Sequence, residues 1–194
     1  MLLAIDTSAG TSVAIVDAGR VLAEASSPDT RGHAEAIGLL IERALGDHRP
    51  DAVVAGMGPG PFTGLRVGIA AARTFALGRG IPVHPVCSHD AVAEGRTAPT
   101  LVVTDARRRE VAYSVYRDGE RVDGPHLAKP DELATLVEGY HALERVDAAE
   151  VSAASLALVA ERLLAAGRPT GPSQPLYLRA PDVTMPGAPK RVTA

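Results

Sequence analysis

A run of glycines and prolines at residues 58–64, Gly-Pro-Gly-Pro-Phe-Thr-Gly, constrains the fold of this chain more than any other feature. An apolar stretch at 53–57 precedes it and predicts a buried strand, and an Ala-rich stretch at 65–77 follows it and predicts a helix. The glycines permit backbone angles that other residues avoid, while the prolines stiffen the loop. We expect Thr63 to cap the helix by accepting a hydrogen bond from a free amide of its first turn.

Such a strand–loop–helix corner has two uses in proteins. The free amides and the dipole at the start of a helix can hold an anion. The same corner can instead be a rigid support that presents the helix to a partner. The loop lacks the Gly-Lys-Ser/Thr ending of a P-loop, and it offers no lysine to a phosphate.

The composition narrows the class of protein. With 194 residues the chain can form one large domain or two small lobes, and 46% apolar residues suffice for a folded core. Aromatic residues make up only 3%, which disfavours a base-stacking platform for single-stranded RNA. The net charge of −3 disfavours tight direct RNA binding, and the single cysteine excludes an internal disulfide.

The sequence gives no sign of secretion or membrane insertion. The chain opens directly into an apolar strand, and no basic segment precedes a long apolar run. No run approaches the roughly 18 apolar residues that a spanning helix needs. We therefore expect a soluble, cytoplasmic protein that does not contact membranes.

Hydrophobic patterning predicts two related halves. The first half reads as strands at 2–6, 12–17, 20–25, 52–57 and 83–86, with helices at 32–45 and 65–77. The second half reads as strands at 101–105 and 110–116, a hairpin turn at 118–122, and helices at 130–137 and 153–166. Two copies of a β-β-β-α-β-α unit predict a duplicated, two-lobed α/β fold, although independent hairpins could give the same pattern.

The second copy is predicted to be the smaller one. We expect lobe one to span residues 1–98, a reduced lobe two to span 99–180, and a flexible tail to span 181–194. Residues 138–152 show little strand signal and contain nothing like the corner at 58–64. In the Pro-rich stretch after Gly167, only residues 176–179 resemble a strand.

Asp6, Thr7 and Ser8 end the first predicted strand, and Asp105 takes the equivalent place in the second half. In a duplicated phosphotransferase fold, these side chains would face Mg²⁺ and phosphate from two sides of a cleft. The alternative is that Asp and Thr simply close turns at the ends of strands. We regard these four residues as, at most, a vestigial phosphate site.

Small residues recur at steps of four along the helix of the corner, at Gly64, Gly68, Ala72 and Ala76. Such a stripe lets another element approach very closely. Its neighbour can lie inside the same lobe, or it can be a helix of a partner. Which of these neighbours the stripe faces also determines whether Arg66 points outward or toward a partner.

The remaining polar motifs give weaker signals. None of the six histidines forms the His-x3-His or His-Glu-x2-His spacing of a zinc site on a helix. His33 is better explained as part of a helix start, with Glu35 two residues later. Three arginines at 107–109 predict either a solvated turn or a contact for an anion or partner.

Five motifs in order make the chain resemble the bacterial TsaB family, also called YeaZ. The motifs cover nearly the whole chain, and the corner is the most specific of them: residues 3–8, the start of the helix at 33–35, the corner at 58–69, the Asp-Ala-Arg-Arg-x-Glu-Val motif at 105–111, and Pro-Leu-Tyr-Leu-Arg at 175–179. The chain is shorter than most such proteins, and the missing length falls at 139–152.

The resemblance implies an α/β, actin-like ATPase (duplicated ribonuclease H-like) fold with two lobes. It also implies a role in making threonylcarbamoyladenosine beside the tRNA anticodon. In that pathway a paralogue, TsaD, carries metal-binding histidines and transfers the group, and TsaE is an ATPase subunit. The chain would be a non-catalytic platform for TsaD, binding tRNA only through the complex and forming a homodimer when alone.

The resemblance further implies where TsaD docks. The two helices of lobe one would form half of a four-helix bundle with the equivalent helices of the paralogue. The residues expected at this interface are His33, Ile37, Leu40, Ile41, Gly64, Arg66, Gly68 and Ala72. We expect no catalytic residues, no metal and no cofactor of its own, with ATP or ADP only at the partner interface.

The rival hypothesis is an enzyme with the same fold. One form is a nucleotide-binding phosphotransferase, and the other is a metallopeptidase, since TsaB-like proteins were once labelled glycoprotease-like. The missing metal histidines and the missing glycine loop in lobe two argue against both.

Overall fold

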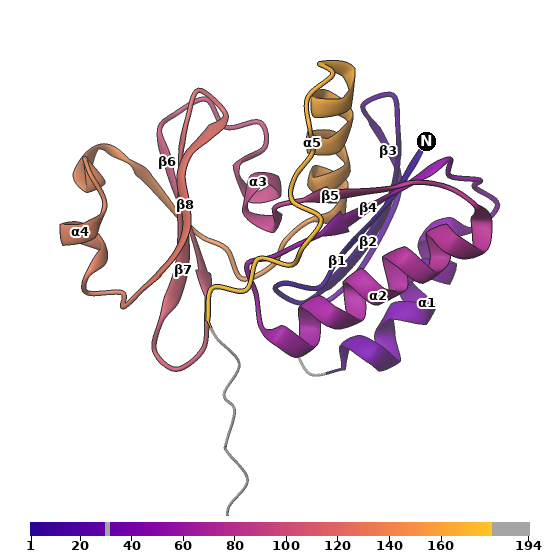
Figure 1. Cartoon of the computed structure of the whole chain (residues 1–194), viewed down its shortest axis with the longest axis horizontal. Coiled ribbons are helices and arrows are strands. Elements are labelled where there is room, and N and C mark those ends of the chain that lie inside the picture. The colour runs from indigo at the N-terminus through magenta and orange to yellow at the C-terminus, as the bar shows by residue number, and fades with distance from the viewer. Residues whose placement is uncertain (30–31, 180–194) are drawn as a thin grey trace, which may run out of the picture.

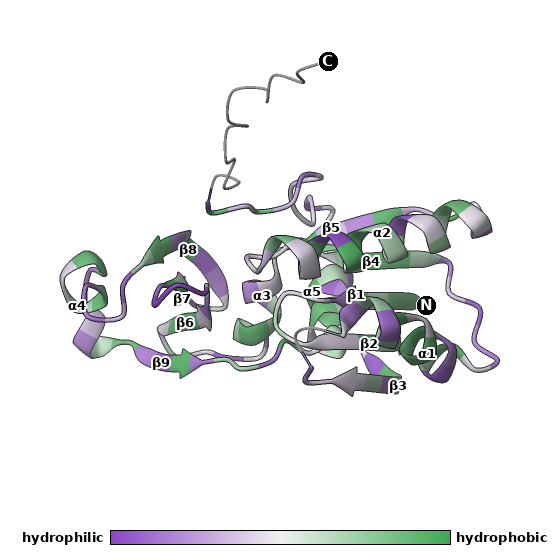
Figure 2. Ribbon diagram, turned by 90° about the horizontal axis from the view of Figure 1, so that it is seen from below, coloured by the Kyte–Doolittle hydropathy of each residue, from purple (hydrophilic) through white to green (hydrophobic). Residues whose placement is uncertain are grey.

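The computed structural model describes residues 1–29 and 32–179 of the chain, which form two lobes side by side (Figures 1 and 2). The expected tail at 181–194 lies outside the described residues. Lobe one contains a five-stranded sheet in the order β3-β2-β1-β4-β5. Its strands are β1 (Leu2–Asp6), β2 (Thr11–Asp17), β3 (Arg20–Ser27), β4 (Ala52–Gly56) and β5 (Val83–Val86).

Helices cover both faces of this sheet (Figure 1). On one face lie α1 (His33–Leu45) and α2 (Phe62–Arg79), packed against Leu3 and Ile5 of β1. On the other face lie α3 (Ser88–Ala93) and α5 (Ala153–Ala165), packed against the alternate residues Leu2 and Ala4. Every residue of β1 and β4 is therefore buried, which explains why both strands read as continuous apolar runs.

Lobe two repeats the first four strands of lobe one. Its sheet has the order β8-β7-β6-β9, and its strands are β6 (Thr100–Asp105), β7 (Val111–Arg117), β8 (Glu120–Ala128) and β9 (Glu144–Asp147). In both sheets the first strand pairs antiparallel with the second and parallel with the fourth. The predicted duplication is confirmed. Among the residues that the structure describes, one face of this second sheet carries only a short helix, α4 (Leu133–Leu136), and the 3-10 turn η1 (Tyr140–Ala142).

Two expectations for the second half are wrong. Residues 138–152 do contain a strand, β9, which takes the place that β4 has in lobe one. The sequence shows no strand pattern here because β9 is a four-residue edge strand, and its Arg145 and Asp147 form an ion pair at the surface. Helix α5, assigned above to lobe two, packs on the sheet of lobe one, so the range 99–180 is not one lobe.

Smaller differences concern the ends of elements. Helix α2 begins at Phe62 with Pro61 as its N-cap, so Thr63 lies inside the helix and does not cap it. The short helix α3 was not expected. Residues 176–179 form no strand, although the amide of Leu176 donates to the carbonyl of Met57 just beyond β4.

The small-residue stripe of α2 faces inward. A side chain on Gly64 would meet the carbonyl oxygen of Thr7 at 2.7 Å, and one on Gly68 would overlap the Thr7 side chain. The Thr7 hydroxyl donates to the carbonyl of Gly64 at 2.7 Å. Ala72 is fully buried in the same core. The internal neighbour is therefore the correct interpretation of the stripe, because α2 lies directly on the end of β1.

In the described ranges, no helix is both long and apolar enough to cross a membrane.

The packing of α2 predicts the effect of enlarging the stripe. Ala72→Leu should overpack the core and lower the free energy of unfolding by roughly 1–3 kcal/mol. For a chain of this size the melting temperature should fall by about 2–12 °C. Ala70→Leu on the exposed side of α2 is the matched control and should melt like the parent protein. Equal melting temperatures for both variants would contradict the buried position of the stripe.

Candidate functional site

The carboxylate of Asp6 is buried at the end of β1 and is fully occupied by neighbours. One oxygen accepts hydrogen bonds from the amide of Ser8 at 2.8 Å and its hydroxyl at 2.5 Å. The other accepts from the Ser88 hydroxyl at 2.5 Å. Gly56 leaves the space for this group, since a side chain there would overlap the carboxylate. Burial raises the pKa of Asp6, and the hydrogen bonds from Ser8 and Ser88 oppose that shift.

The structure does not pair Asp6 with Asp105 across an open cleft. Asp105 is exposed at the end of β6, where its carboxylate accepts from the amide of Arg107. Asp6, Thr7 and Ser8 are each less than 6% exposed. The vestigial phosphate site therefore divides into a buried cluster of hydrogen bonds and a separate surface acid.

The neighbouring residues Ser88 and His89 join the two lobes, because Ser88 makes its hydrogen bonds in lobe one and His89 makes its hydrogen bonds to lobe two. Ser88 binds Asp6 in lobe one and accepts from the amide of Gly58 at 3.0 Å. The ring nitrogens of His89 each lie 2.9 Å from a hydroxyl of lobe two, Nδ1 from Ser114 and Nε2 from Thr104. Neither residue stands out in the sequence, because α3 is too short to show a helical pattern.

Two further candidate reactive groups, His33 and Cys87, are also hydrogen-bonded or buried. His33 shares a hydrogen bond of 2.7 Å with the Thr11 hydroxyl. Burial raises the pKa of the Cys87 thiol to about 12. Within residues 1–29 and 32–179, no cluster of three or more His, Cys, Asp or Glu could hold a metal ion.

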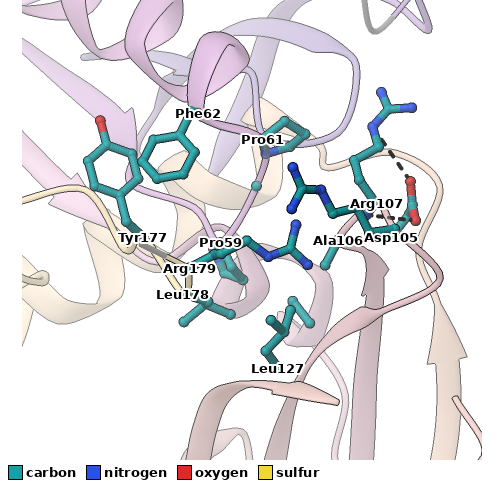
Figure 3. Close-up of a pocket in the computed structure, with 13 residues that line it drawn as sticks. Pro59, Pro61, Phe62, Asp105, Ala106, Arg107, Leu127, Tyr177, Leu178 and Arg179 are labelled. Atoms are coloured by element: carbon teal, nitrogen blue, oxygen red, sulfur yellow. Dashed lines mark hydrogen bonds and ion pairs between the residues drawn. The ribbon is translucent and has the colours of Figure 1, made fainter. Parts of the chain in front are cut away.

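Three segments that are distant in the sequence meet at one cleft between the lobes (Figure 3). They are the corner before α2, the turn after β6, and the strap at 177–179. The cavity between them measures about 210 Å³. Its lining consists of Pro59, Gly60, Pro61, Phe62, Asp105, Ala106, Arg107, Arg108, Ala112, Leu127, Tyr177, Leu178 and Arg179.

Aromatic and charged contacts hold the strap in place. The ring of Tyr177 stacks on Phe62 with 4.4 Å between centroids, and Arg66 donates to the Tyr177 hydroxyl at 3.2 Å. Arg179 then forms an ion pair with Glu110 of lobe two. The strap therefore crosses from one lobe to the other along the edge of the cleft.

The comparisons with known proteins agree with this fold. The family model described as tRNA N6-adenosine threonylcarbamoyltransferase (TsaD) matches residues 20–167. An uncharacterized protein of Mycobacterium tuberculosis is 42% identical over 174 residues, which cover 84% of this chain and 82% of that protein. Another, from Mycobacterium leprae, is 46% identical over 147 residues, 69% of this chain but only 40% of that protein.

Together with the family model, a named relative and a solved structure identify the family. The Bacillus subtilis tRNA threonylcarbamoyladenosine biosynthesis protein TsaB is 31% identical over 125 residues, 60% of this chain and 55% of that protein. The structure of YeaZ from Pseudomonas aeruginosa matches with a TM-score of 0.74 at 25% identity, over 91% of this chain and 99% of that one. The chain belongs to the TsaB (YeaZ) family. The resemblance read from the five motifs is confirmed.

Most of the interface residues expected from the TsaB resemblance are not on the surface of this chain. Arg66 is exposed. The others are buried or partly buried in lobe one: His33, Ile37, Leu40, Ile41, Gly64, Gly68 and Ala72. These residues lie on the apolar faces of α1 and α2, and those faces cover the sheet. The outward faces carry other side chains, including Leu39, which is 65% exposed, and Leu77, which is 84% exposed.

The buried His89 predicts an acid-sensitive junction between the lobes. Burial, together with the charge of Arg121, lowers the pKa of His89 from 6.5 to about 3. Between these pH values the unfolded chain binds a proton at residue 89 and the folded chain does not. The free energy of unfolding should therefore fall as the pH drops through this window, by as much as about 1.4 kcal/mol per pH unit.

The measurement is urea unfolding at a series of pH values for the parent and for His89→Gln. An amide can replace the ring as both donor and acceptor, so the variant should show the shallower loss of stability towards acid. Asp6 titrates in both proteins, and its contribution cancels in the difference. His141→Gln changes an exposed histidine and should keep the parent's slope. Parallel curves for the parent and His89→Gln would contradict the prediction.

Proposed function

We propose that this chain is a non-catalytic partner of a TsaD-type transferase, which attaches the threonylcarbamoyl group to the adenosine beside the tRNA anticodon. Membership of the TsaB family supports the pathway, because a relative carries the name of a threonylcarbamoyladenosine biosynthesis protein. The occupied carboxylate of Asp6 supports the non-catalytic role. Ser8 and Ser88 hold both of its oxygens where an active enzyme of this fold would need them for Mg²⁺ and phosphate.

The alternative, a phosphotransferase or metallopeptidase, requires reactive groups that are accessible. Asp6 and His89 are at most 1% exposed, and each makes hydrogen bonds through both of its polar side-chain atoms. Using either group would require breaking buried hydrogen bonds, at roughly 1–3 kcal/mol each. This cost favours the partner role.

We further propose that TsaD docks on the outward faces of α1 and α2. Exposed leucines are the side chains that a helix-packing interface would bury, and both helices present one. Without TsaD the same surface would pair with a second copy of the chain about a two-fold axis. The ATPase subunit TsaE and the tRNA would then join through the assembled complex, and ATP or ADP would bind only at the interface between partners.

The transfer reaction tests the pathway. Purified TsaD-type protein from the same organism, supplied with TsaE, ATP and a threonylcarbamoyl donor, should modify tRNA only when this chain is added, and this chain alone should neither transfer the group nor hydrolyse ATP. Equal transfer with and without the chain would refute the role. ATP turnover that disappears in Asp6→Ala would support the enzyme alternative.

Charged substitutions test the docking surface. Leu39→Glu and Leu77→Glu place a carboxylate where an apolar contact is expected, so each should weaken capture of TsaD by roughly tenfold or more. Because both positions are exposed, the melting temperatures should stay close to that of the parent. Leu136→Glu is the matched control, since Leu136 is 55% exposed on α4 of lobe two. Equal capture by all three variants would place the interface elsewhere.

A further inference from the structure

One wall of the cleft between the lobes is the strap, and aromatic stacking helps to hold it in place. Tyr177 stacks on Phe62 of α2, and Leu178 and Arg179 of the strap also line the cavity (Figure 3). Residues 177–179 belong to no helix or strand, and Tyr177 is 37% exposed. The strap can therefore leave the cleft without disrupting a hydrogen-bonded helix or sheet.

Arg66 links the strap to the outward face of α2. Its Nε donates to the Tyr177 hydroxyl at 3.2 Å. Its guanidinium carbon lies 5.7 Å from the centroid of the Tyr177 ring and 5.5 Å from that of Phe62, within reach of a cation–π contact with both rings. Arg66 is nevertheless exposed, so the side chain that holds the strap is also accessible to a partner.

Arg66 lies on the same stripe of α2 as Leu77, which the docking surface proposed above includes. Residues 66, 70, 73 and 77 follow one another at steps of four and three, so they share one face of the helix, and all four are exposed. Residues 66 and 77 are about 17 Å apart along the helix axis. A typical interface covers about 800 Å² of each partner, a patch roughly 30 Å across. An interface that includes Leu77 has room for Arg66 as well.

We propose that the strap is a displaceable wall of the cleft, which Arg66 holds in place and which a partner releases by binding Arg66. The inference rests on the proposed function, docking of TsaD on the outward face of α2, and adds a consequence of docking. The partner group that suits Arg66 is a carboxylate, because a guanidinium–carboxylate pair is stronger than a hydrogen bond to a neutral hydroxyl. Turning towards such a group takes the Nε donor away from Tyr177. The buried hydrogen bonds of Ser88 and His89 remain, so release changes the wall of the cleft and not the spacing of the lobes.

The coupling between the strap and the partner works in both directions. If binding of a partner breaks the contact between Arg66 and the strap, then loss of that contact by mutation must strengthen binding of the partner. Two measurements, one without TsaD and one with it, therefore test the two halves of the proposal.

Chymotrypsin cleavage after Tyr177 measures release of the strap in the isolated full-length chain, with mass spectrometry identifying the cleaved bond. Arg66→Ala removes the donor and the charge, so cleavage there should become roughly three- to tenfold faster, the effect of one lost hydrogen bond. Arg79→Ala is the matched control, since the Arg79 guanidinium lies 5.4 Å from the centroid of the Phe75 ring at the other end of the same helix. It should change the rate by less than about twofold. Melting curves will establish that both variants fold.

Capture of the TsaD-type protein measures the coupling. Tyr177→Phe keeps a ring to stack on Phe62 but removes the hydroxyl that accepts from Arg66, and it leaves α2 unchanged. The variant should bind TsaD more tightly than the parent, by roughly threefold or more. Tyr140→Phe is the matched control, because the Tyr140 hydroxyl also accepts from an arginine, Arg145, at 3.2 Å, and lies in lobe two. Its affinity for TsaD should equal that of the parent.

Two results would overturn the proposal. They are equal cleavage rates for Arg66→Ala and Arg79→Ala, and an affinity of Tyr177→Phe for TsaD that is equal to or weaker than that of the parent. Both can occur while the parent captures TsaD normally, and the partner role then stands without this inference. Failure of the parent to capture TsaD would refute the docking surface and the release by TsaD together.

Discussion

The buried hydrogen bond between Asp6 and Ser88 fixes the centre of this molecule. Asp6 ends β1 and Ser88 begins α3. The Ser88 hydroxyl also accepts a hydrogen bond from the amide of Gly58, at the corner before α2. One serine therefore joins the middle strand of lobe one, the corner that aims α2, and the helix that leads to lobe two. A buried carboxylate without partners is strongly unfavourable, so separating these three segments would cost considerable free energy.

The next residue carries the same constraint into lobe two, where His89 is held by Ser114 and Thr104. At the other side of the lobe junction, Arg162 of α5 pairs with Glu94 and with Glu120. Arg162 is 43% exposed in these two contacts, and such pairs contribute little individually, so the buried residues Ser88 and His89 set the spacing of the lobes. A fixed spacing suits a platform better than an enzyme that must close on its substrate.

The sequence predicts the helices and strands whose own residues show a clear pattern. It does not predict which element packs against which neighbour. The apolar runs of β1 and β4 and the periodic face of α1 identified those elements correctly. Strand β9 was not predicted because its charged residues form an ion pair at the edge of the sheet and give no apolar pattern. The sheet that α5 covers, and the inward face of α2, could not be read from the sequence, because apolar and small residues suit an internal neighbour and a partner equally.

The composition of α2 itself restricts how this family member can meet a partner. Gly64, Gly68 and Ala72 face Thr7 and the core, and they allow the close backbone contact of α2 inside lobe one. The same residues are therefore not available for close contact with a partner. What remains outside includes the larger side chains of Arg66, Arg73 and Leu77. Of these, Arg66 binds the Tyr177 hydroxyl of the strap, and Arg73 donates to the carbonyl of Ser173 in the segment just before the strap. A partner that packs on the Leu77 end of α2 leaves these contacts intact, whereas one that packs beside Arg66 and Arg73 displaces contacts that hold the wall of the cleft.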